Sequence, residues 1–543
     1  MSEVQHRQLL AAHEVLPPTP APWGAATLAE LVLRSAARHG NRTALWVDGC
    51  SVSYSELVAL ASQIACSLAG SGLGPGNARC GILANRSLTA FAGILGALLA
   101  GSAYVPLNPA HPTERLSSVL KSADVDALIV DGSAAESAAD LLSTSQPLRV
   151  LLPQATSVPD WAVRAPQHRY FCRGDLEGSE PISRAPGSPD DGAYLLHTSG
   201  STGVPKGILV RHRNVIAYLR NVAARYAPTP QDRFSQFFDL TFDLSVHDIF
   251  LCWGAGATLY CPPPRVRFAP REFARRHALT MWFSVPSTAA MMMGLRMLRP
   301  GDLPTLRFSL FCGEVLPKQI VRAWAAAAPN SAIENLYGPT EATIAITAFR
   351  LPKDPAQLAV LPDVTPIGTA LPNQDTALFD AADLPADEGE LCLAGTQVTD
   401  GYWRDAALTD QRFIRFAGDN RIWYRTGDRA RLSTEHGLLF LGRLDRQVKI
   451  AGYRIELDEI EAILQHIVGT NAAAVAWPIG PEGLARGIVA FIKEVELSDQ
   501  IILDQCRRLL PAYAVPDVIR RTNQWPVNSN GKTDRARLLA MME

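Results

Sequence analysis

The stretch 195–207, LLHTSGSTGVPKG, carries the strongest local signal in the chain. An apolar run at 193–196 leads into six residues, 198–203, that are all Gly, Ser or Thr, and Lys206 follows them. Glycines let a backbone turn inward and direct its N–H groups at phosphate oxygens, while hydroxyls add donors and a lysine adds positive charge. Such clusters are usually surface turns, but this order of residues favours a phosphate-binding loop.

The spacing within this loop excludes two other phosphate motifs. The P-loop pattern GxxxxGK[ST] cannot be aligned anywhere in the chain. The glycine-rich stretch GSGLGPG at 70–76 fails the spacing of a GxGxxG dinucleotide loop, so we expect an ordinary turn there.

The loop resembles, almost letter for letter, the phosphate loop of the adenylate-forming superfamily. That superfamily comprises acyl-CoA synthetases, peptide-synthetase adenylation domains and firefly luciferase. Its other motifs follow in the required order, and on this series of matches the chain is identified as a member. The matching segments are SYSEL (53–57), AGSAYVPLNP (100–109), NLYGPTEAT (335–343), GELCLAG to GYW (389–403), YRTGD (424–428), GRLDRQVKIAGYRIELDEIE (442–461), LPAYAVP (510–516) and NGKTDR (530–535).

Length and patterning predict an α/β protein of at least two domains. A chain of 543 residues is too long for one ordinary core. Helical and strand patterns alternate from Leu28 onward, which is typical of layered α/β folds. The uncharged run 87–113 is interrupted by Gly101 and Pro106, so we expect a buried helix followed by a strand and not a membrane span. The remaining expected elements are helices at 28–38, 54–69, 457–467 and 498–510, and strands at 44–47, 80–83, 472–477 and 487–492.

Together with the resemblance, these patterns predict the domain organisation. We expect a large N-terminal adenylation core, 1–444, built of layered α/β sheets plus a small β-barrel-like part. A small mobile α/β domain, 445–543, should follow and carry the catalytic lysine.

The bulk properties limit the location and the partners. A net charge of −2 argues against a broad surface for nucleic acid. Nine cysteines without a CxxC pair argue against a zinc knuckle or a disulfide framework. The N-terminus lacks the layout of a secretory signal. We therefore expect a cytoplasmic enzyme without a membrane or nucleic-acid partner.

The resemblance implies ATP and Mg²⁺ as cofactors and assigns the nucleotide-binding residues. Tyr337 should stack on the adenine, although a Tyr before Gly-Pro is also explained by turn packing. Asp428 should accept hydrogen bonds from both ribose hydroxyls, unless it only caps a turn. Arg443 should be a second ribose or phosphate contact, or else a structural ion pair. The other implied cofactor-binding residues are Thr198, Ser199, Gly200, Ser201, Thr202, Gly203 and Lys206 for the phosphates, and Gly313, Glu314, Asn335 and Gly338 for the adenine edge.

The catalytic roles also come from the resemblance. Thr340 should contact the α-phosphate, and Glu341 should hold Mg²⁺, because a hard cation between phosphates needs a carboxylate oxygen. Lys532 should stabilise the charge that builds when the substrate carboxylate attacks the α-phosphate. Asp445 should be the hinge on which the C-terminal domain swings between an adenylating pose and a thiol-transfer pose. In the second pose Lys532 leaves the site, and the loop 449–452 approaches the thiol channel.

TFDLSVHDIF, 241–250, gives the substrate class. In amino-acid-activating relatives an aspartate at the place of Asp243 pairs with the substrate ammonium, which would offset the desolvation of a buried carboxylate. The alternative is an Asp that caps the helix beginning near Leu244. Phe242 should be an aromatic gate beside the substrate carboxylate. The other implied pocket residues are mainly apolar and uncharged: Leu244, His247, Ser284, Leu310, Cys312, Leu336, Ile344 and Ala345.

SLFCGEVLP, 309–317, together with FDLSVHD resembles the D-alanine–carrier-protein ligases. Similar pockets occur in free-standing ligases that load alanine, proline or β-amino acids onto carrier proteins for natural-product assembly, including antibiotics. A small neutral amino acid is therefore expected, with alanine first. The acceptor should be the phosphopantetheine thiol of a separate acyl carrier protein, met in trans, with coenzyme A as an alternative. An acid–CoA ligase and a catalytically silent nucleotide-binding protein remain rival functions.

Overall fold

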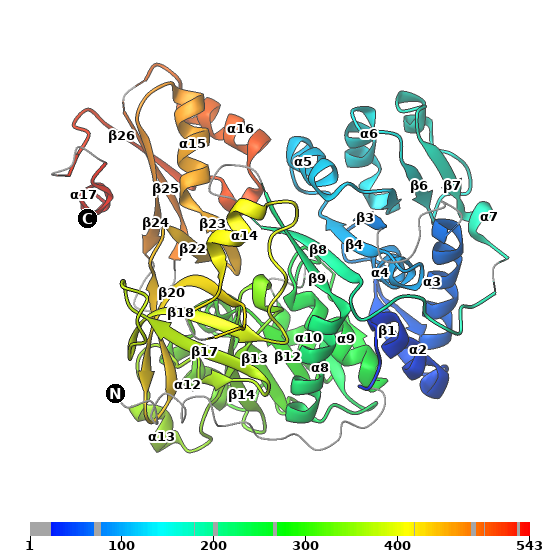
Figure 1. Ribbon diagram of the computed structural model, residues 1–543, viewed down its shortest axis with the longest axis horizontal. Coiled ribbons are helices and arrows are strands. Elements are labelled where there is room, and N and C mark those ends of the chain that lie inside the picture. The colour runs from blue at the N-terminus through cyan, green and yellow to red at the C-terminus, as the bar shows by residue number, and fades with distance from the viewer. Residues whose placement is uncertain are drawn as a thin grey trace.

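The computed structural model describes most of the chain (Figure 1). The turn at 70–76, the core of the phosphate loop at 199–203 and Lys532 lie outside the described residues. The described ranges are 23–69, 78–178, 180–198, 205–263, 266, 269–416, 419–478, 485–493, 495–528 and 533–542.

A seven-stranded sheet, mostly parallel, forms the first layered unit. Its strand order is β7-β6-β5-β3-β4-β8-β9, and only the last pair, β8 and β9, is antiparallel. Helix α4 carries almost only apolar residues and is buried from Thr89 to its end, as its sequence predicts. The strands are β3 (Arg79–Leu83), β4 (Ala103–Leu107), β5 (Ala127–Val130), β6 (Arg149–Leu152), β7 (Arg169–Cys172), β8 (Gly192–Thr198) and β9 (Lys206–Arg211), and the helices α3 (Tyr54–Ala69), α4 (Leu88–Leu99), α5 (Thr113–Ala123), α6 (Ala135–Ser143) and α7 (Arg173–Leu176).

A nine-stranded sheet forms the second layered unit. Its order is β16-β15-β14-β13-β12-β10-β11-β1-β2, with a parallel centre from β14 to β1. The fully buried helix α9 packs against α2 and α8. The strands are β1 (Thr43–Val47), β2 (Cys50–Ser53), β10 (Arg233–Ser235), β11 (Thr258–Tyr260), β12 (Met281–Ser284), β13 (Phe308–Phe311), β14 (Ala332–Tyr337), β15 (Thr347–Arg350) and β16 (Thr369–Ala370), and the helices α2 (Leu28–His39), α8 (His212–Tyr226), α9 (Leu244–Ala255), α10 (Pro270–Arg276), α11 (Pro286–Gly294), α12 (Lys318–Ala327) and α13 (Pro355–Val360).

The small β part of the N-terminal core is a five-stranded antiparallel sheet. Strand β20 lies in its centre and carries the YRTGD motif. Its elements are β17 (Gln374–Phe379), β18 (Glu388–Gly395), α14 (Ala406–Arg412), β19 (Phe413–Ile414), β20 (Trp423–Ser433) and β21 (Gly437–Arg443).

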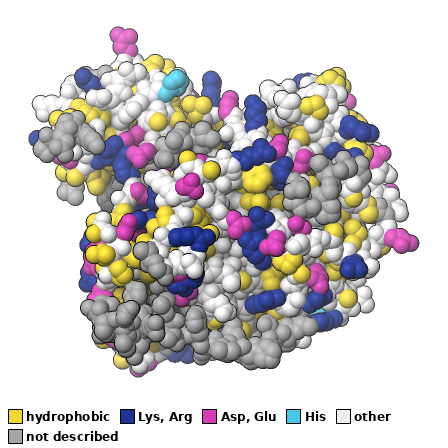
Figure 2. Space-filling view, in the orientation of Figure 1, with side chains coloured by type: hydrophobic (Ala, Val, Ile, Leu, Met, Phe, Trp, Pro, Cys, Tyr) yellow, Lys and Arg dark blue, Asp and Glu magenta, His cyan; other side chains and the backbone are white. Residues whose placement is uncertain are grey.

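The C-terminal region has its own hydrophobic core, formed by a hairpin, a three-stranded sheet and two amphipathic helices. The predicted elements are confirmed with ends shifted by one or two residues. Domain separation at 444/445 stays a prediction. Figure 2 shows the face between this region and the seven-stranded sheet hollowed. The elements are β22 (Gln447–Ile450), β23 (Tyr453–Glu456), α15 (Leu457–Val468), β24 (Ala472–Pro478), β25 (Ala485–Lys493), α16 (Asp499–Leu509), β26 (Val518–Thr522) and α17 (Arg535–Ala540).

Two further predictions can be compared with this structure. All nine cysteines lie within the described ranges, and none of them forms a disulfide. Within the same ranges, no helix combines the length and the apolar character that crossing a lipid bilayer requires.

Candidate functional site

Three adjoining cavities lie where the two large sheets, the five-stranded sheet and the β22–β23 hairpin meet. A central cavity of about 110 Å³ receives residues from the ends of β8, β13 and β14, as expected for ligand sites at the carboxyl ends of strands. A second cavity of about 340 Å³ adjoins it beside Tyr337, and a third of about 500 Å³ lies beside α11. The predicted site residues that line the central cavity are Thr198, Phe242, Asp243, Leu244, Cys312, Gly313, Gly338, Thr340, Asp428 and Arg443.

Asp243 places its carboxylate at the central cavity. It stands immediately before helix α9, in the N-cap position, yet its carboxylate makes no capping hydrogen bond to the first turn, whose residues are all described. Instead Oδ2 accepts a hydrogen bond from the backbone N–H of Ile344 at 3.1 Å. Burial raises the pKa of Asp243 to about 6, although this hydrogen bond opposes the shift. The capping alternative is therefore wrong, and the carboxylate is available to a buried cation.

The backbone that holds Asp243 turns through two left-handed residues. Thr343 has φ +56° and Ile344 has φ +71°, which β-branched residues rarely adopt. Gln397 holds this turn. Its side-chain Nε2 donates to backbone carbonyls of the turn, and the shortest of these hydrogen bonds is 2.8 Å. The backbone carbonyl of Gln397 accepts a hydrogen bond from Thr343 Oγ1 at 2.5 Å. Strained turns that the surroundings over-determine are common at functional sites. Gln397 was missed, since a lone glutamine after GELCLAG has no recognisable signal.

Gly338 is required where this turn crosses the end of β14. A Cβ at Gly338 would lie 2.6 Å from Cα of Ala345. A side chain there would push the turn away from Asp243.

The ten predicted pocket residues separate into two groups. Four of them line the central cavity: Phe242, Asp243, Leu244 and Cys312. The other six do not line the central cavity: Ser284 lines the third cavity, Leu336 lines the second, and His247, Leu310, Ile344 and Ala345 are buried in the described core.

His247 is buried behind the residues that line the central cavity. Its Nδ1 lies 2.7 Å from the hydroxyl of Tyr218, and its ring packs against Phe283. Burial lowers the pKa of His247 to about 3, so the ring is neutral at physiological pH. Leu244 and Cys312, which line the central cavity with Asp243, add no charge to its wall.

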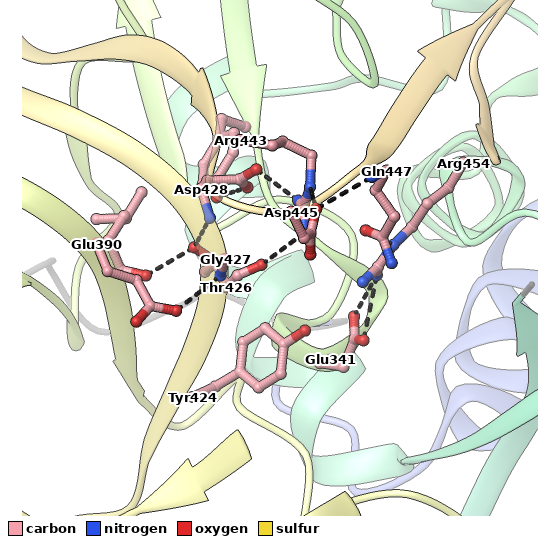
Figure 3. Close-up of polar contacts among 12 residues, drawn as sticks. Glu341, Glu390, Tyr424, Thr426, Gly427, Asp428, Arg443, Asp445, Gln447 and Arg454 are labelled. Atoms are coloured by element: carbon pink, nitrogen blue, oxygen red, sulfur yellow. Dashed lines mark hydrogen bonds and ion pairs between the residues drawn. The ribbon is translucent and has the colours of Figure 1, made fainter. Parts of the chain in front are cut away.

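Several residues that were predicted to contact the nucleotide line the second cavity, and Figure 3 shows the polar contacts of two of them, Asp428 and Arg443. The hydroxyl of Tyr337 donates to Oδ2 of Asp428, whose Oδ1 pairs with Arg443 at 2.5 Å. Arg443 also pairs with Asp445 at 2.6 Å, so its guanidinium links the predicted hinge residue to Asp428. The structural ion pair of Arg443 is thus observed, and its contact with ribose or phosphate stays a prediction.

Two buried acceptors in the second cavity suit an adenine amino group. Nδ2 of Asn335 donates to the carbonyls of Thr365 and Pro366, while its Oδ1 is buried without a partner among the described residues. The hydroxyl of Thr365 is likewise buried without a hydrogen-bond partner among the described residues. Buried polar atoms are normally hydrogen-bonded, so these two atoms point to a polar ligand.

Glu341 was predicted to hold Mg²⁺. Its carboxylate is 1% exposed and accepts a hydrogen bond from the Tyr402 hydroxyl at 2.8 Å. Nη1 of Arg454 lies 3.1 Å from each of its oxygens. Burial alone would raise the pKa of Glu341, but the charge of the Arg454 guanidinium and the hydrogen bonds to the carboxylate together outweigh burial and hold the pKa below its ordinary value. The buried carboxylate of Glu341 thus has a cation, the guanidinium of Arg454, as its partner. A carboxylate that pairs with a cation in this way also fits a metal ion.

The β22–β23 hairpin closes the site from the C-terminal side. The N–H of Gly452 donates to Oε1 of Glu314 at 2.8 Å, and Ser287 donates to the other carboxylate oxygen. The ring of Tyr453 lies 5.0 Å from that of Phe242 and stacks at 3.8 Å on Tyr513. The loop 449–452 thus lies at the site, and its role in a thiol-transfer pose stays a prediction. Glu314 contributes its carboxylate to this contact as well as lining the second cavity.

Comparisons with known proteins agree with this geometry. The family described as AMP-binding enzyme matches residues 32–403. The L-proline–[L-prolyl-carrier protein] ligase of Pseudomonas fluorescens is 34% identical over 530 residues, which cover 95% of this chain and 99% of that protein. The chondramide synthase of Chondromyces crocatus is 32% identical over 497 residues, which cover 89% of this chain but only 12% of that protein.

Solved structures show the same fold. The adenylation domain AlmE of Vibrio cholerae, in complex with glycyl-adenosine-5'-phosphate, superposes with a TM-score of 0.85 at 31% identity, covering 97% of this chain and 99% of that one. IdnL7 superposes with a TM-score of 0.70 at 35% identity, covering 95% and 99%.

Proposed function

Because the chain belongs to the AMP-binding enzyme family, we propose that it activates a small neutral amino acid with ATP and then transfers it to a thiol. In the first step the substrate carboxylate attacks the α-phosphate and pyrophosphate leaves. In the second step a thiolate attacks the aminoacyl carbonyl and AMP leaves. The phosphopantetheine arm of a separate carrier protein is the proposed acceptor, and biosynthesis of a natural product is the proposed setting.

The observation that carries this proposal is the Asp243 carboxylate at the central cavity. It is buried, held by the Ile344 N–H and not engaged in capping α9. An ammonium group is the ligand that would compensate its buried charge. An acid without an amino group would leave that charge unpaired, which disfavours the acid–CoA ligase alternative.

Alanine is favoured by the sequence, and proline is supported by the similarity to the prolyl-carrier protein ligase. Both have short uncharged side chains, which the wall formed by Leu244 and Cys312 would accept. Both also present a cationic nitrogen to Asp243. Glycine, the aminoacyl group in the AlmE complex, would leave part of this space empty.

The other residues would hold the nucleotide. Lys206 would pair with phosphate oxygens, Asp428 with the ribose hydroxyls, and the buried acceptors of Asn335 and Thr365 with the adenine amino group. Mg²⁺ held by Glu341 would neutralise charge on the triphosphate. A catalytically silent nucleotide-binding protein would share these contacts, so the measurement of pyrophosphate exchange separates it from an enzyme.

The direct test is amino-acid-dependent exchange of pyrophosphate into ATP. We expect exchange with L- or D-alanine or with proline, weaker exchange with glycine and β-alanine, and little with leucine or glutamate. Propionate and acetate are the matched acids without an amino group. Exchange with propionate but with no amino acid would contradict the proposal, and ATP binding without any exchange would favour the silent protein.

The KM for the amino acid is expected to rise as the pH falls. Asp243 has a raised pKa of about 6, so the empty site holds a carboxylate above this pH and a neutral acid below it. Only the carboxylate pairs with the ammonium, so KM should rise about tenfold per pH unit below pH 6. A pH profile of KM measured by exchange checks this, with the KM for ATP as the internal control. A KM for the amino acid that stays constant down to about pH 5 would contradict it.

A further inference from the structure

The segment 396–399, directly after β18, is fixed to helix α8 on one side. Nδ2 of Asn214 donates to the carbonyl of Thr396 at 2.9 Å, and Nδ2 of Asn221 donates to Oε1 of Gln397 at 3.3 Å. Both asparagines lie on α8, seven residues apart and therefore on the same side of the helix. Helix α8 thus determines where the side chain of Gln397 lies.

On its other side Gln397 holds the turn 342–345. Its Nε2 donates to carbonyls of the turn, and the hydrogen bond to Ala345 is the shortest of them, 2.8 Å. In return the carbonyl of Gln397 accepts from Thr343 Oγ1 at 2.5 Å. Water does not compete for these hydrogen bonds, because Gln397 and Thr343 are both 0% exposed. A buried group that loses such a partner is costly, so the side chain and the turn fix each other.

The turn needs these hydrogen bonds because its conformation is unfavourable by itself. Thr343 and Ile344 are β-branched, yet both have a positive φ, +56° and +71°. Without Gln397 the two residues would relax to negative φ, which would rotate the Ile344 N–H away from Asp243, to which it donates at 3.1 Å. Gln397 therefore acts on Asp243 although it lines none of the three described cavities.

Glu341, just before this turn, has anchors of its own. Its backbone carbonyl accepts from the N–H of Thr399 at 2.9 Å, and its carboxylate accepts from the Tyr402 hydroxyl at 2.8 Å. Neither hydrogen bond involves the side chain of Gln397. Loss of the Gln397 amide should therefore release Ile344 and leave Glu341 in place.

We propose that Gln397 is a positioning residue for amino-acid recognition, because it holds the turn 342–345 and thereby orients Asp243 toward the substrate ammonium. This rests on the proposed pairing of Asp243 with an ammonium group. Nucleotide binding is left to other residues, since Glu341 is held independently. An amide suits this role, because its N–H groups satisfy carbonyls that the left-handed turn directs inward. Methionine has a similar size but offers no such donor.

Hydrogen–deuterium exchange of the Ile344 amide tests the positioning without any substrate. The full chain is compared with Gln397→Met, and exchange is followed by mass spectrometry with fragmentation that resolves this amide. We expect exchange about tenfold faster in Gln397→Met, because the turn then opens more often and frees the Ile344 N–H from Asp243. Parental protection of Ile344 in a folded Gln397→Met variant would overturn the proposal.

Two Thr→Val variants form a matched pair and cover the case in which Gln397→Met folds poorly. Thr343 and Thr347 are both 0% exposed, and each hydroxyl donates to a backbone carbonyl, that of Gln397 at 2.5 Å and that of Ile367 at 2.7 Å. Valine keeps the shape of threonine and removes only the hydroxyl.

Only the change that reaches Gln397 should affect the turn. Thr343→Val should speed exchange at Ile344 about threefold or more, the effect of losing one buried hydrogen bond, and Thr347→Val should keep the parental rate. Equal rates at Ile344 in the two variants would overturn the proposal, because the turn would then not depend on its contact with Gln397.

Pyrophosphate exchange then separates positioning from ordinary structural support. In Gln397→Met the KM for the amino acid should rise about tenfold, while the KM for ATP stays within about twofold, because Glu341 keeps its own contacts. A lower kcat with both KM values unchanged, or an equal rise of both, would overturn the proposal. A parent chain without amino-acid-dependent exchange would contradict the proposed function alone, and hydrogen exchange at Ile344 would then decide the role of Gln397.

Discussion

The Asp243→Asn variant should lose about 10²- to 10³-fold in kcat/KM for amino-acid-dependent pyrophosphate exchange, because an ammonium group left without its buried partner costs about 3–5 kcal/mol. The amide oxygen can still accept the hydrogen bond that Ile344 donates to Asp243. The variant therefore removes the charge and keeps the shape. The KM for ATP should change little, because the second cavity is not altered.

The same variant should not be destabilised, which separates the loss of activity from unfolding. Burial raises the pKa of Asp243 to about 6, above its unfolded value of 3.8. For an acid, a raised folded-state pKa means that the native protein is less stable at pH values above it and gains stability as the pH falls through it. A neutral amide avoids this cost. Thermal unfolding at about pH 8 should therefore occur at the same or a higher temperature in Asp243→Asn.

Asp248 provides the matched control on the same helix. It is 1% exposed, and burial raises its pKa in the same direction, but it lines none of the three described cavities. Asp248→Asn should keep its exchange activity. Equal losses in both variants would show that α9 needs buried carboxylates for its structure, and would contradict the ammonium site.

The fold could be predicted from the sequence where the hydrophobic periodicity agrees with the Gly and Pro residues that end or interrupt the elements. Helix α15 begins at Leu457 after a strand-like run and ends before Gly469, so both its ends were readable. Helix α4 has no polar face, and the interruptions at Gly101 and Pro106 distinguished it from a membrane span. The strand order could not be predicted, because β1 and β2 join a sheet whose other strands begin almost two hundred residues later.

The site was predictable only where its residues stand in a recognisable motif. Asp243 was assigned because its motif resembles that of amino-acid-activating relatives, and the cost of a buried carboxylate gave the physical reason for a cationic partner. Tyr402 was quoted within a motif, but its hydrogen bond to Glu341 depends on packing between β18 and the turn after β14. Arg454 is one arginine among several in its segment. Only the relative placement of the hairpin and the core reveals that it neutralises Glu341.

Lys532→Ala is expected to slow adenylation strongly and to leave thiol transfer nearly unchanged. Pyrophosphate exchange should fall about 10²- to 10³-fold, since removing one preorganised cation from the transition state typically costs this much. Transfer from a chemically prepared aminoacyl adenylate to a phosphopantetheine thiol should stay within about threefold of the parent, since the docked hairpin places Lys449, Gly452 and Arg454 at the site. Exchange at the parental rate would contradict the role of Lys532.

Arg454→Gln should instead lower thiol transfer more than pyrophosphate exchange. Comparing this variant with Lys532→Ala tests whether the two steps use different poses of the C-terminal domain. We propose that the docked β23 belongs to the thiol-transfer pose, so losing the pair between Arg454 and Glu341 should lower transfer from the prepared adenylate by about tenfold or more. Exchange should fall less than transfer, because Glu341 is then freed for the metal. A protein that used a single pose for both steps would lose both activities together in each variant. Opposite losses therefore require two poses of the C-terminal domain, with Lys532 serving the first and Arg454 the second.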